Sequence, residues 1–197
     1  MAAICVYCAS GEGIAASYVQ LAAEVGTRLA AGGHSLVSGG GRVSMMGAVA
    51  RASRIGGART VGVIPEQLVG YEVADTEADE LVVVETMRER KRVMDERADA
   101  FLALPGGIGT LEELFEVWTA GSLGMHAKPV VVLDPRSEHG DFYAPLWSFL
   151  DGLCERGFVR KAALDGLHRV ASVAEAFDVL ERELSRAADR GYAAESA

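Results

Sequence analysis

Short, uninterrupted apolar runs alternate with amphipathic segments along this chain, and this alternation is the feature that most restricts its fold. Residues 4–8, 60–64 and 129–133 are examples of the apolar runs, which are rich in valine, isoleucine and leucine. Strands that read as continuous apolar runs are buried on both faces, which is typical of parallel sheets. Amphipathic helices between such strands cover the two faces of the sheet. The sequence therefore predicts an α/β fold.

Predicted elements can be placed along the chain. We expect strands at residues 4–8, 35–37, 60–64, 81–84, 100–104 and 129–133, and a short one near 168–171. We expect helices at residues 17–31, 45–54, 88–97, 144–155 and 173–187, and one that Thr110 opens. Residues 66–80 are acidic without periodicity and are predicted to form a loop over the strand ends, and residues 135–141 a surface loop. The whole pattern favours a three-layer, doubly wound (Rossmann-like) parallel sheet with helices on both faces.

Composition excludes several classes of protein. The chain has 197 residues, which fit one domain, expected over residues 1–190 with a frayed tail at 191–197. Half of the residues are hydrophobic, as in globular proteins, and the net charge of −9 argues against nonspecific nucleic-acid binding. No apolar run approaches the roughly 20 residues of a membrane span, and the N-terminus lacks the basic start of a signal peptide. We expect a cytoplasmic protein with neither a nucleic-acid nor a membrane partner.

The cysteines do not predict a metal site. Cys5 and Cys8 form a C-x-x-C pattern, but residues three apart in a strand point to opposite faces of the sheet. No second pair completes a zinc site, and the four histidines are scattered without ligand spacing. We interpret the cysteines as buried strand residues and assign no metal.

A glycine-rich segment, residues 105–110, follows the predicted strand at 100–104 and opens a helix. A strand that ends in glycines before a helix binds phosphate, because free backbone N–H groups and the positive helix end face the anion. Thr110 is expected to cap this helix and to offer its hydroxyl group to the same phosphate. Glu113 lies one turn further on, which suggests chemistry on a phosphorylated sugar. The alternative is that Glu113, like Glu112, only interacts with the helix dipole.

A second glycine cluster, residues 38–47, invites comparison with dinucleotide-binding sites. The G-x-G-x-x-G fingerprint that begins at Gly39 requires glycine at position 44, where Ser44 stands, and no acidic residue ends the next strand. The pattern therefore does not favour an enzyme that uses NAD(P). It favours a turn that admits the sugar or phosphate of a ligand, with a merely tight strand-to-helix turn as the alternative.

Four cations, Arg88, Arg90, Lys91 and Arg92, occupy the start of the helix predicted at 88–97. Such a group usually forms a solvated helix face. Here the helix begins at the carboxyl end of a strand, so Arg90 and Lys91 are expected near the same rim as the glycine loops. The planar fork of arginine suits a phosphate group or a pair of sugar hydroxyls.

At these residues the chain resembles the LONELY GUY (LOG) family, whose members are often mislabelled lysine decarboxylases. Residues 105–113 fit the family signature PGGxGTxxE, and Arg90-Lys91 fits its upstream R-K pair. The resemblance extends from the first strand to Lys128-Pro129. It implies a nucleotide-binding domain that hydrolyses the N-glycosidic bond of cytokinin riboside 5′-monophosphates, which are N6-substituted AMP, and often of AMP. The products are free base and ribose 5-phosphate. It also implies a homodimer with sites near the interface, and no cofactor.

The resemblance also assigns roles to residues. Arg90 and Glu113 would be the catalytic pair. The implied substrate-binding set is Ser10, Gly41, Met46, Glu66, Met87, Arg90, Lys91, Gly106, Gly107, Ile108, Gly109, Thr110, Leu111, Glu112, Glu113 and Thr119. Two positions depart from the family pattern: Arg88 stands where the family has histidine, and Ala9 where it has glycine. Both could alter the preference among bases.

A mechanism follows as a hypothesis. Hydrolysis of a nucleotide's glycosidic bond passes through an oxocarbenium-like sugar, which a carboxylate stabilises while it orients or deprotonates water. Glu113 is the candidate, with Arg90 holding the phosphate or ribose, and no residue is identified as proton donor to the leaving base. The main rival is a non-catalytic carrier of nucleotides or molybdenum cofactor with the same fold. A decarboxylase that uses pyridoxal phosphate is a weaker alternative, because no lysine lies in a recognisable Schiff-base context.

Overall fold

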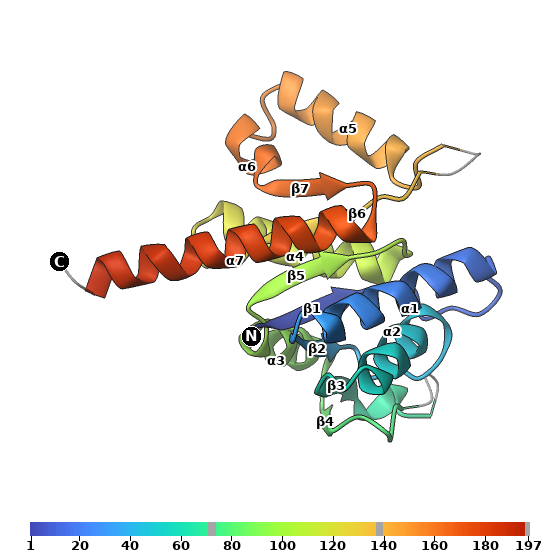
Figure 1. The fold of residues 1–197 in the computed structure, drawn as a ribbon. Helices are drawn as coiled ribbons and strands as arrows, with labels where there is room; N and C mark the ends of the chain where they lie inside the picture. The colour runs from blue at the N-terminus through green and yellow to red at the C-terminus, as the bar shows by residue number, and fades with distance from the viewer. Residues whose placement is uncertain (71–73, 137–139, 196–197) are drawn as a thin grey trace.

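One parallel sheet organises the molecule. The computed structural model describes residues 1–70, 74–136 and 140–195. Within these residues seven strands follow the order β4-β3-β2-β1-β5-β6-β7 (Figure 1). The strands are β1 Ala3–Tyr7, β2 Ser35–Ser38, β3 Thr60–Pro65, β4 Glu80–Val84, β5 Ala100–Ala103, β6 Val130–Leu133 and β7 Leu167–Val170. All of the pairings between them are parallel, which confirms the predicted α/β class.

The helices agree closely with those expected. They are α1 Ala16–Ala31, α2 Ser44–Ile55, α3 Met87–Arg97, α4 Ile108–Ser122, α5 Ala144–Glu155, α6 Lys161–Asp165 and α7 Val173–Glu195, with a 3₁₀ turn η1 at Glu66–Leu68. The sequence did not predict α6, because five residues are too few to show a helical period. Helix α7 continues past the sheet through most of the tail predicted at 191–197, of which residues 196 and 197 lie outside the described residues (Figure 1).

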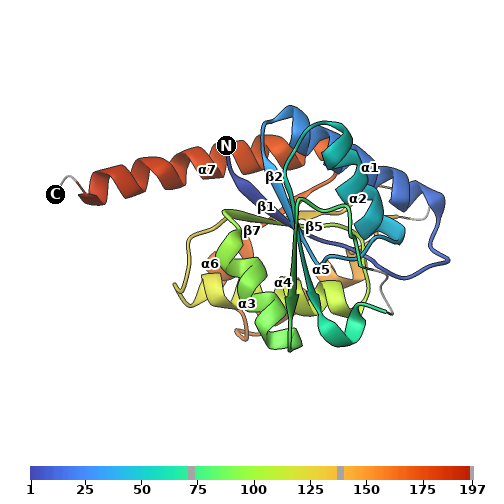
Figure 2. The same cartoon turned by 90° about the horizontal axis from the view of Figure 1, so that it is seen from below.

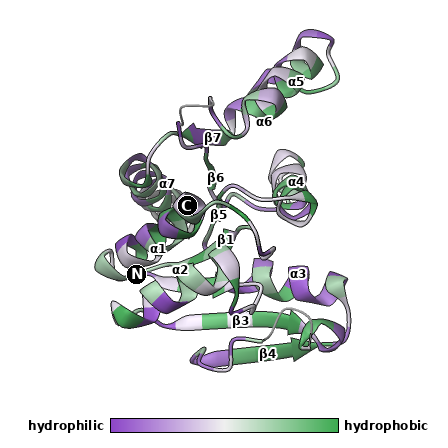
Figure 3. Ribbon diagram, turned by 90° about the vertical axis from the view of Figure 1, so that its right-hand side faces the viewer, coloured by the Kyte–Doolittle hydropathy of each residue, from purple (hydrophilic) through white to green (hydrophobic). Residues whose placement is uncertain are grey.

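Helices cover both faces of the sheet. One apolar core lies between the sheet and α1, α2 and α7, and it includes Val25, Val49 and Phe177. The other lies between the sheet and α3, α4 and α5, and it includes Met94 and Trp147. Figures 2 and 3 show α1, α2 and α7 on one side of the sheet and α3 and α4 on the other. The three-layer prediction is therefore confirmed.

The two strand cysteines contribute to different cores. Cys5 packs in the core under α3 and α4, whereas Cys8 packs in the core under α1 and α2. Both are free and buried, and burial raises the pKa of each thiol. The prediction that the C-x-x-C pair is split between the two faces is confirmed.

The order of the strands determines where a ligand can bind. From β1 the chain winds outward through β2 and β3 to β4, and it then crosses back through α3 to β5 on the other side of β1. Ile4 of β1 accordingly pairs with Leu36 of β2 and with Ala100 of β5. The connections that leave β1 and β5 diverge, and in doubly wound sheets ligands bind in the crevice between such connections.

His34 is a buried titratable group at the amino ends of the strands, directly before β2. It is 8% exposed, and neither ring nitrogen has a hydrogen-bond partner in the described part of the chain. It packs beside Phe177, with Arg28, Glu181 and the N-terminus as its charged neighbours. Burial lowers the pKa of the imidazole below 6.5.

This arrangement predicts a pH-dependent stability. Because the unfolded chain binds a proton at His34 more readily than the folded one, the free energy of unfolding should fall as the pH drops below about 6.5. His34→Leu should remove this contribution and flatten the profile. Urea unfolding between about pH 7.5 and about pH 5 measures it. Parallel profiles for wild type and variant would show that His34 does not contribute.

Candidate active site

A cavity of about 380 Å³ opens at the carboxyl ends of the central strands. This volume lies within the usual range for small-molecule sites, roughly 300–1,000 Å³. The connections after β1 and β5 contribute to its wall, together with α2, α3 and α4. Its lining residues are Cys8, Ala9, Ser10, Gly11, Ile14, Met46, Leu68, Met87, Arg90, Gly107, Gly109, Thr110, Glu112 and Glu113.

The glycine-rich segment after β5 presents the start of α4 to this cavity. Gly107 is the N-cap, and the Leu111 N–H donates to the Gly107 carbonyl at 3.0 Å, so the amides before Leu111 precede the hydrogen-bond ladder of the helix. A Cβ atom at Gly106 would lie 2.1 Å from Thr110 Oγ1, so only glycine fits there. The segment has the backbone of an anion cradle.

The predicted cap was wrong in one respect. Thr110 is the third residue of α4 and does not cap it, because Gly107 occupies the cap position without a side chain to donate or accept. Thr110 is instead 4% exposed and lines the cavity.

Arg90 reaches from α3 to the ends of β2 and β3. Its Nε donates to the Val63 carbonyl at 3.1 Å, and its Nη2 donates to the Gly39 carbonyl at 2.7 Å. The residue is only 4% exposed, and a buried charge requires such hydrogen bonds. The carbonyl groups therefore determine where the guanidinium lies in the cavity wall.

Glu113 projects from α4 into the same cavity and is partly buried. Burial raises the pKa of the Cys5 and Cys8 thiols most, and the negative charge of Glu113 raises it further. The carboxylate therefore lies close to the end of β1. The positive charge of Arg90 acts on Cys5 in the opposite direction. The fold thus brings the two predicted catalytic residues, which are distant in sequence, to one cavity.

Lys91 faces a different neighbour from Arg90. It forms ion pairs with Glu112 and Glu116 of α4 and is absent from the cavity lining. Burial works against its charge, but its hydrogen bonds to the two glutamates raise the pKa of the ammonium group. Lys91 therefore joins α3 to α4 beside the cavity.

The remaining predicted residues divide into two groups. The first group lines the cavity and consists of Ser10, Met46, Met87, Arg90, Gly107, Gly109, Thr110, Glu112 and Glu113. The predicted residues that do not line it are Gly41, Glu66, Lys91, Gly106, Ile108, Leu111 and Thr119. Gly41 is buried, with its N–H directed to Met46 Sδ at 3.0 Å, whereas Glu66, Ile108 and Thr119 are exposed.

Several lining residues were not predicted. Gly11 and Ile14 follow β1, and Leu68 belongs to η1. The connection after the first strand could have been proposed from the rule that ligands bind where the strand order reverses, had that order been known. Among the described residues, no group of three or more His, Cys, Asp or Glu side chains could hold a metal ion.

Comparisons with known proteins identify the family. A family model described as "Possible lysine decarboxylase" matches residues 46–180. A protein of Mycobacterium tuberculosis named "Cytokinin riboside 5'-monophosphate phosphoribohydrolase" is 50% identical over 173 residues, which are 88% of this chain and 90% of that protein. A rice protein, "Cytokinin riboside 5'-monophosphate phosphoribohydrolase LOG", is 46% identical over 81% of this chain and 64% of its own length. This chain belongs to the LOG family.

Solved structures with the LOG-type fold include more distant proteins. The molybdenum cofactor carrier protein of Chlamydomonas reinhardtii superposes with a TM-score of 0.71 at 22% identity, over 93% of this chain and 98% of that one. A molybdenum cofactor binding protein of Rippkaea orientalis gives a TM-score of 0.70 at 19% identity, over 92% of this chain and 96% of its own. At such identities the similarity concerns the fold alone.

The position of Arg90 predicts that adding a methyl group at Gly39 destabilises the protein. A Cβ atom at Gly39 would lie 2.0 Å from Arg90 Nη2, so Gly39→Ala should displace the guanidinium from both carbonyl acceptors. Losing two hydrogen bonds from a charged group should lower the free energy of unfolding by about 2–4 kcal/mol.

Gly109→Ala is the control, because nothing lies within 4 Å of a Cβ atom there. Alanine inside a helix should leave stability unchanged or raise it by up to about 1 kcal/mol. Denaturant titrations of both variants test the prediction. Equal stability of the two variants would mean that Gly39 does not hold Arg90.

Proposed function

We propose that this LOG-family protein is a hydrolase that cleaves the N-glycosidic bond of cytokinin riboside 5′-monophosphates and of AMP. The products are free base and ribose 5-phosphate. The observation that carries the proposal is one cavity that combines the family's signature loop, Arg90 and Glu113. The names of the mycobacterial and rice relatives support the same reaction.

The 5′-phosphate is bound by the start of α4. Amide groups at residues 107–110 and the positive end of the helix face the anion, and Thr110 adds a hydroxyl group. A site that requires this anion favours nucleoside monophosphates over nucleosides. The local dipole and Arg90 provide this attraction despite the net charge of −9.

Glu113 acts on the anomeric carbon. As the bond to the base breaks, positive charge develops on the ribose, and a carboxylate beside C1′ stabilises it. The same carboxylate orients water and accepts its proton as the new C–O bond forms. The base leaves with the electron pair of the broken bond, so one water supplies both the new hydroxyl group on C1′ and the proton that the base gains. Arg90 holds the ribose or the phosphate so that the sugar faces Glu113. Water is the only co-reactant in this scheme, and the proposal assigns no cofactor.

The proposal includes a homodimer with its sites near the interface. Two apolar side chains at the cavity would be left in water by a monomer: Met87 in its lining is 45% exposed, and Ile108, between the lining residues Gly107 and Gly109, is 89% exposed. Exposed apolar groups at one place favour association. A cytoplasmic location belongs to the same proposal, and none of the described helices is long and apolar enough to cross a membrane.

The role of Glu113 predicts a separation of binding from catalysis. Glu113→Gln should lower the rate of base release from AMP roughly 1,000-fold, because the amide cannot supply the negative charge or accept a proton. The affinity for AMP, measured by calorimetry, should change little. Glu116→Gln is the matched control on the same helix, since Glu116 pairs with Lys91 outside the cavity. Near-normal turnover by Glu113→Gln would refute the assignment.

The cavity lining predicts a preference among bases. Ile14, Met46, Leu68 and Met87 give the cavity an apolar wall suited to an N6-isopentenyl group. Burial of this group should raise kcat/KM for isopentenyladenosine monophosphate about tenfold over AMP. Chromatography of free base and ribose 5-phosphate, formed in equal amounts, measures both reactions. Binding of both nucleotides without release of base would instead support the carrier function.

A further inference from the structure

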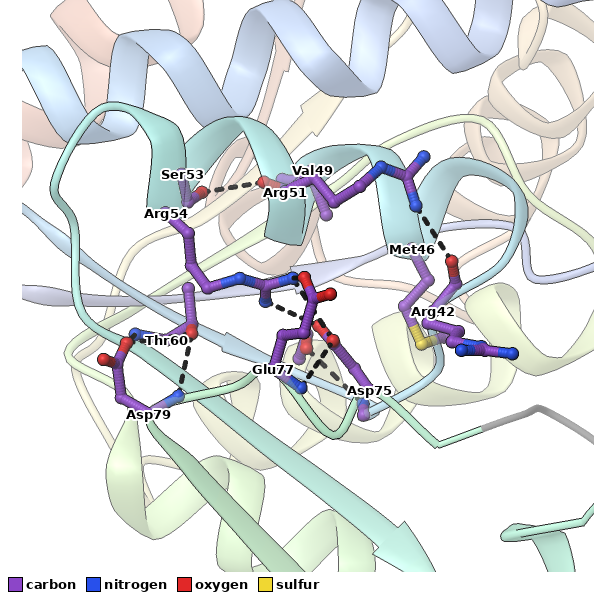
Figure 4. Close-up of polar contacts among 12 residues, drawn as sticks. Arg42, Met46, Val49, Arg51, Ser53, Arg54, Thr60, Asp75, Glu77 and Asp79 are labelled. Atoms are coloured by element: carbon purple, nitrogen blue, oxygen red, sulfur yellow. Dashed lines mark hydrogen bonds and ion pairs between the residues drawn. The ribbon is translucent and has the colours of Figure 1, made fainter.

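A network of ion pairs joins α2 to the segment that contains Asp75 and Glu77 (Figure 4). This segment contacts residues 39–41, which follow β2 and are called the glycine loop below. Arg54, Asp75 and Glu77 do not line the active-site cavity. Arg54 of α2 contacts Asp75 through two hydrogen bonds, Nη1 to Oδ2 at 2.7 Å and Nη2 to Oδ1 at 3.2 Å. Arg54 Nη2 also reaches Glu77 Oε2 at 3.2 Å. The side chains of Arg54 and Asp75 are 16% and 6% exposed. This bidentate ion pair is largely shielded from water, unlike the exposed ion pairs of the surface.

The backbone beside Asp75 is fastened to the glycine loop. The Asp75 N–H donates to the Gly40 carbonyl at 2.8 Å, and Ala74 forms an antiparallel bridge with Gly41. Gly40 has a φ of +76°, and a Cβ atom there would lie 3.2 Å from Val63 N and from Ile64 Cβ. Consecutive glycines have the greatest backbone freedom, so contacts from outside the loop decide where its carbonyl groups lie.

The same loop supplies an acceptor to Arg90. The Gly39 carbonyl that accepts from Arg90 Nη2 at 2.7 Å directly precedes Gly40, which Asp75 holds. Contacts therefore run from Arg54 through Asp75 and the glycine loop to the guanidinium. Neither Arg54 nor Asp75 lines the active-site cavity.

We propose that Arg54 and Asp75 are positioning residues for Arg90. They hold the glycine loop so that the Gly39 carbonyl aligns the guanidinium for the nucleotide. This inference rests on the proposed function, in which Arg90 contacts substrate. The alternative is that the pair contributes only to stability, and the chain offers a control for it.

Asp79 is the control residue. It belongs to the same connecting segment and accepts hydrogen bonds from Thr60 N at 2.7 Å and Thr60 Oγ1 at 3.0 Å (Figure 4). Thr60 begins β3, whereas the glycine loop follows the end of β2, so Asp79 lies at the other end of the parallel strands. Asp79→Asn perturbs the segment without touching the loop.

AMP binding to Glu113→Gln protein, measured by calorimetry, tests the proposal without consuming the nucleotide. Adding Asp75→Asn should raise the Kd about tenfold, and adding Asp79→Asn should leave it within about twofold. Adding Arg90→Ala should raise the Kd at least as much as Asp75→Asn. Asp75→Asn on top of Arg90→Ala should then produce no further rise, because residues that act through one group are not additive.

Each other outcome has a definite meaning. Equal effects of Asp75→Asn and Asp79→Asn, or an Asp75→Asn effect that persists beside Arg90→Ala, would overturn the positioning role and leave the proposed function intact. An unchanged Kd with Arg90→Ala would overturn the role of Arg90 in the proposed function, and the positioning role with it. If Asp75→Asn does not fold, Arg54→Lys replaces it, because lysine keeps the charge but cannot form the two-pronged contact. The Kd should then rise in the same direction.

Discussion

The reversal of winding direction at β1 is the constraint on which the rest of the structure depends. Because the strand order changes direction between β1 and β5, the connections that follow these two strands separate and leave a crevice. Helix α4 begins at this crevice, and α3 begins beside it after crossing from β4. The anion cradle, Arg90 and Glu113 come from these helices and connections. Their proximity is a consequence of the topology rather than of closeness in sequence.

Backbone carbonyl groups, as well as side chains, hold the charged groups of the site in position. The guanidinium of Arg90 is almost fully buried and donates to two carbonyl groups at the strand ends. Two fixed dipoles thus limit the positions that it can adopt, and a chain of contacts through Asp75 limits the loop that carries one of them. Glu113 faces the same space from α4. A carboxylate opposed by a cation and a helix dipole can act on a sugar that becomes positive while its phosphate stays bound.

Sequence reasoning recovered the sheet because buried parallel strands leave continuous apolar runs, and those runs lie where β1 to β7 are found. It also placed a glycine-rich segment at the start of a helix, where the structure has α4, and the role of this segment as an anion cradle stays a prediction. It could not show that Arg90 lines the cavity whereas Lys91 does not. Adjacent helical residues point about 100° apart, so one lies in the cavity wall and the other pairs with α4.

Other features left no local signal. Thr110 was mistaken for a cap because the capping position holds a glycine, which also satisfies helix starts. Asp75 lies in an acidic stretch without periodicity, and only the folded chain brings it to Gly40 and Arg54. Contacts of this kind depend on tertiary structure, and spacing along the sequence does not encode them.

The most direct measurement is a crystal structure of the Glu113→Gln protein with AMP bound. The account predicts that the 5′-phosphate accepts hydrogen bonds from the amides of residues 107–110, and that the side chain at position 113 faces C1′ of the ribose. A nucleotide bound elsewhere, or a side chain at position 113 directed into solvent, would contradict it.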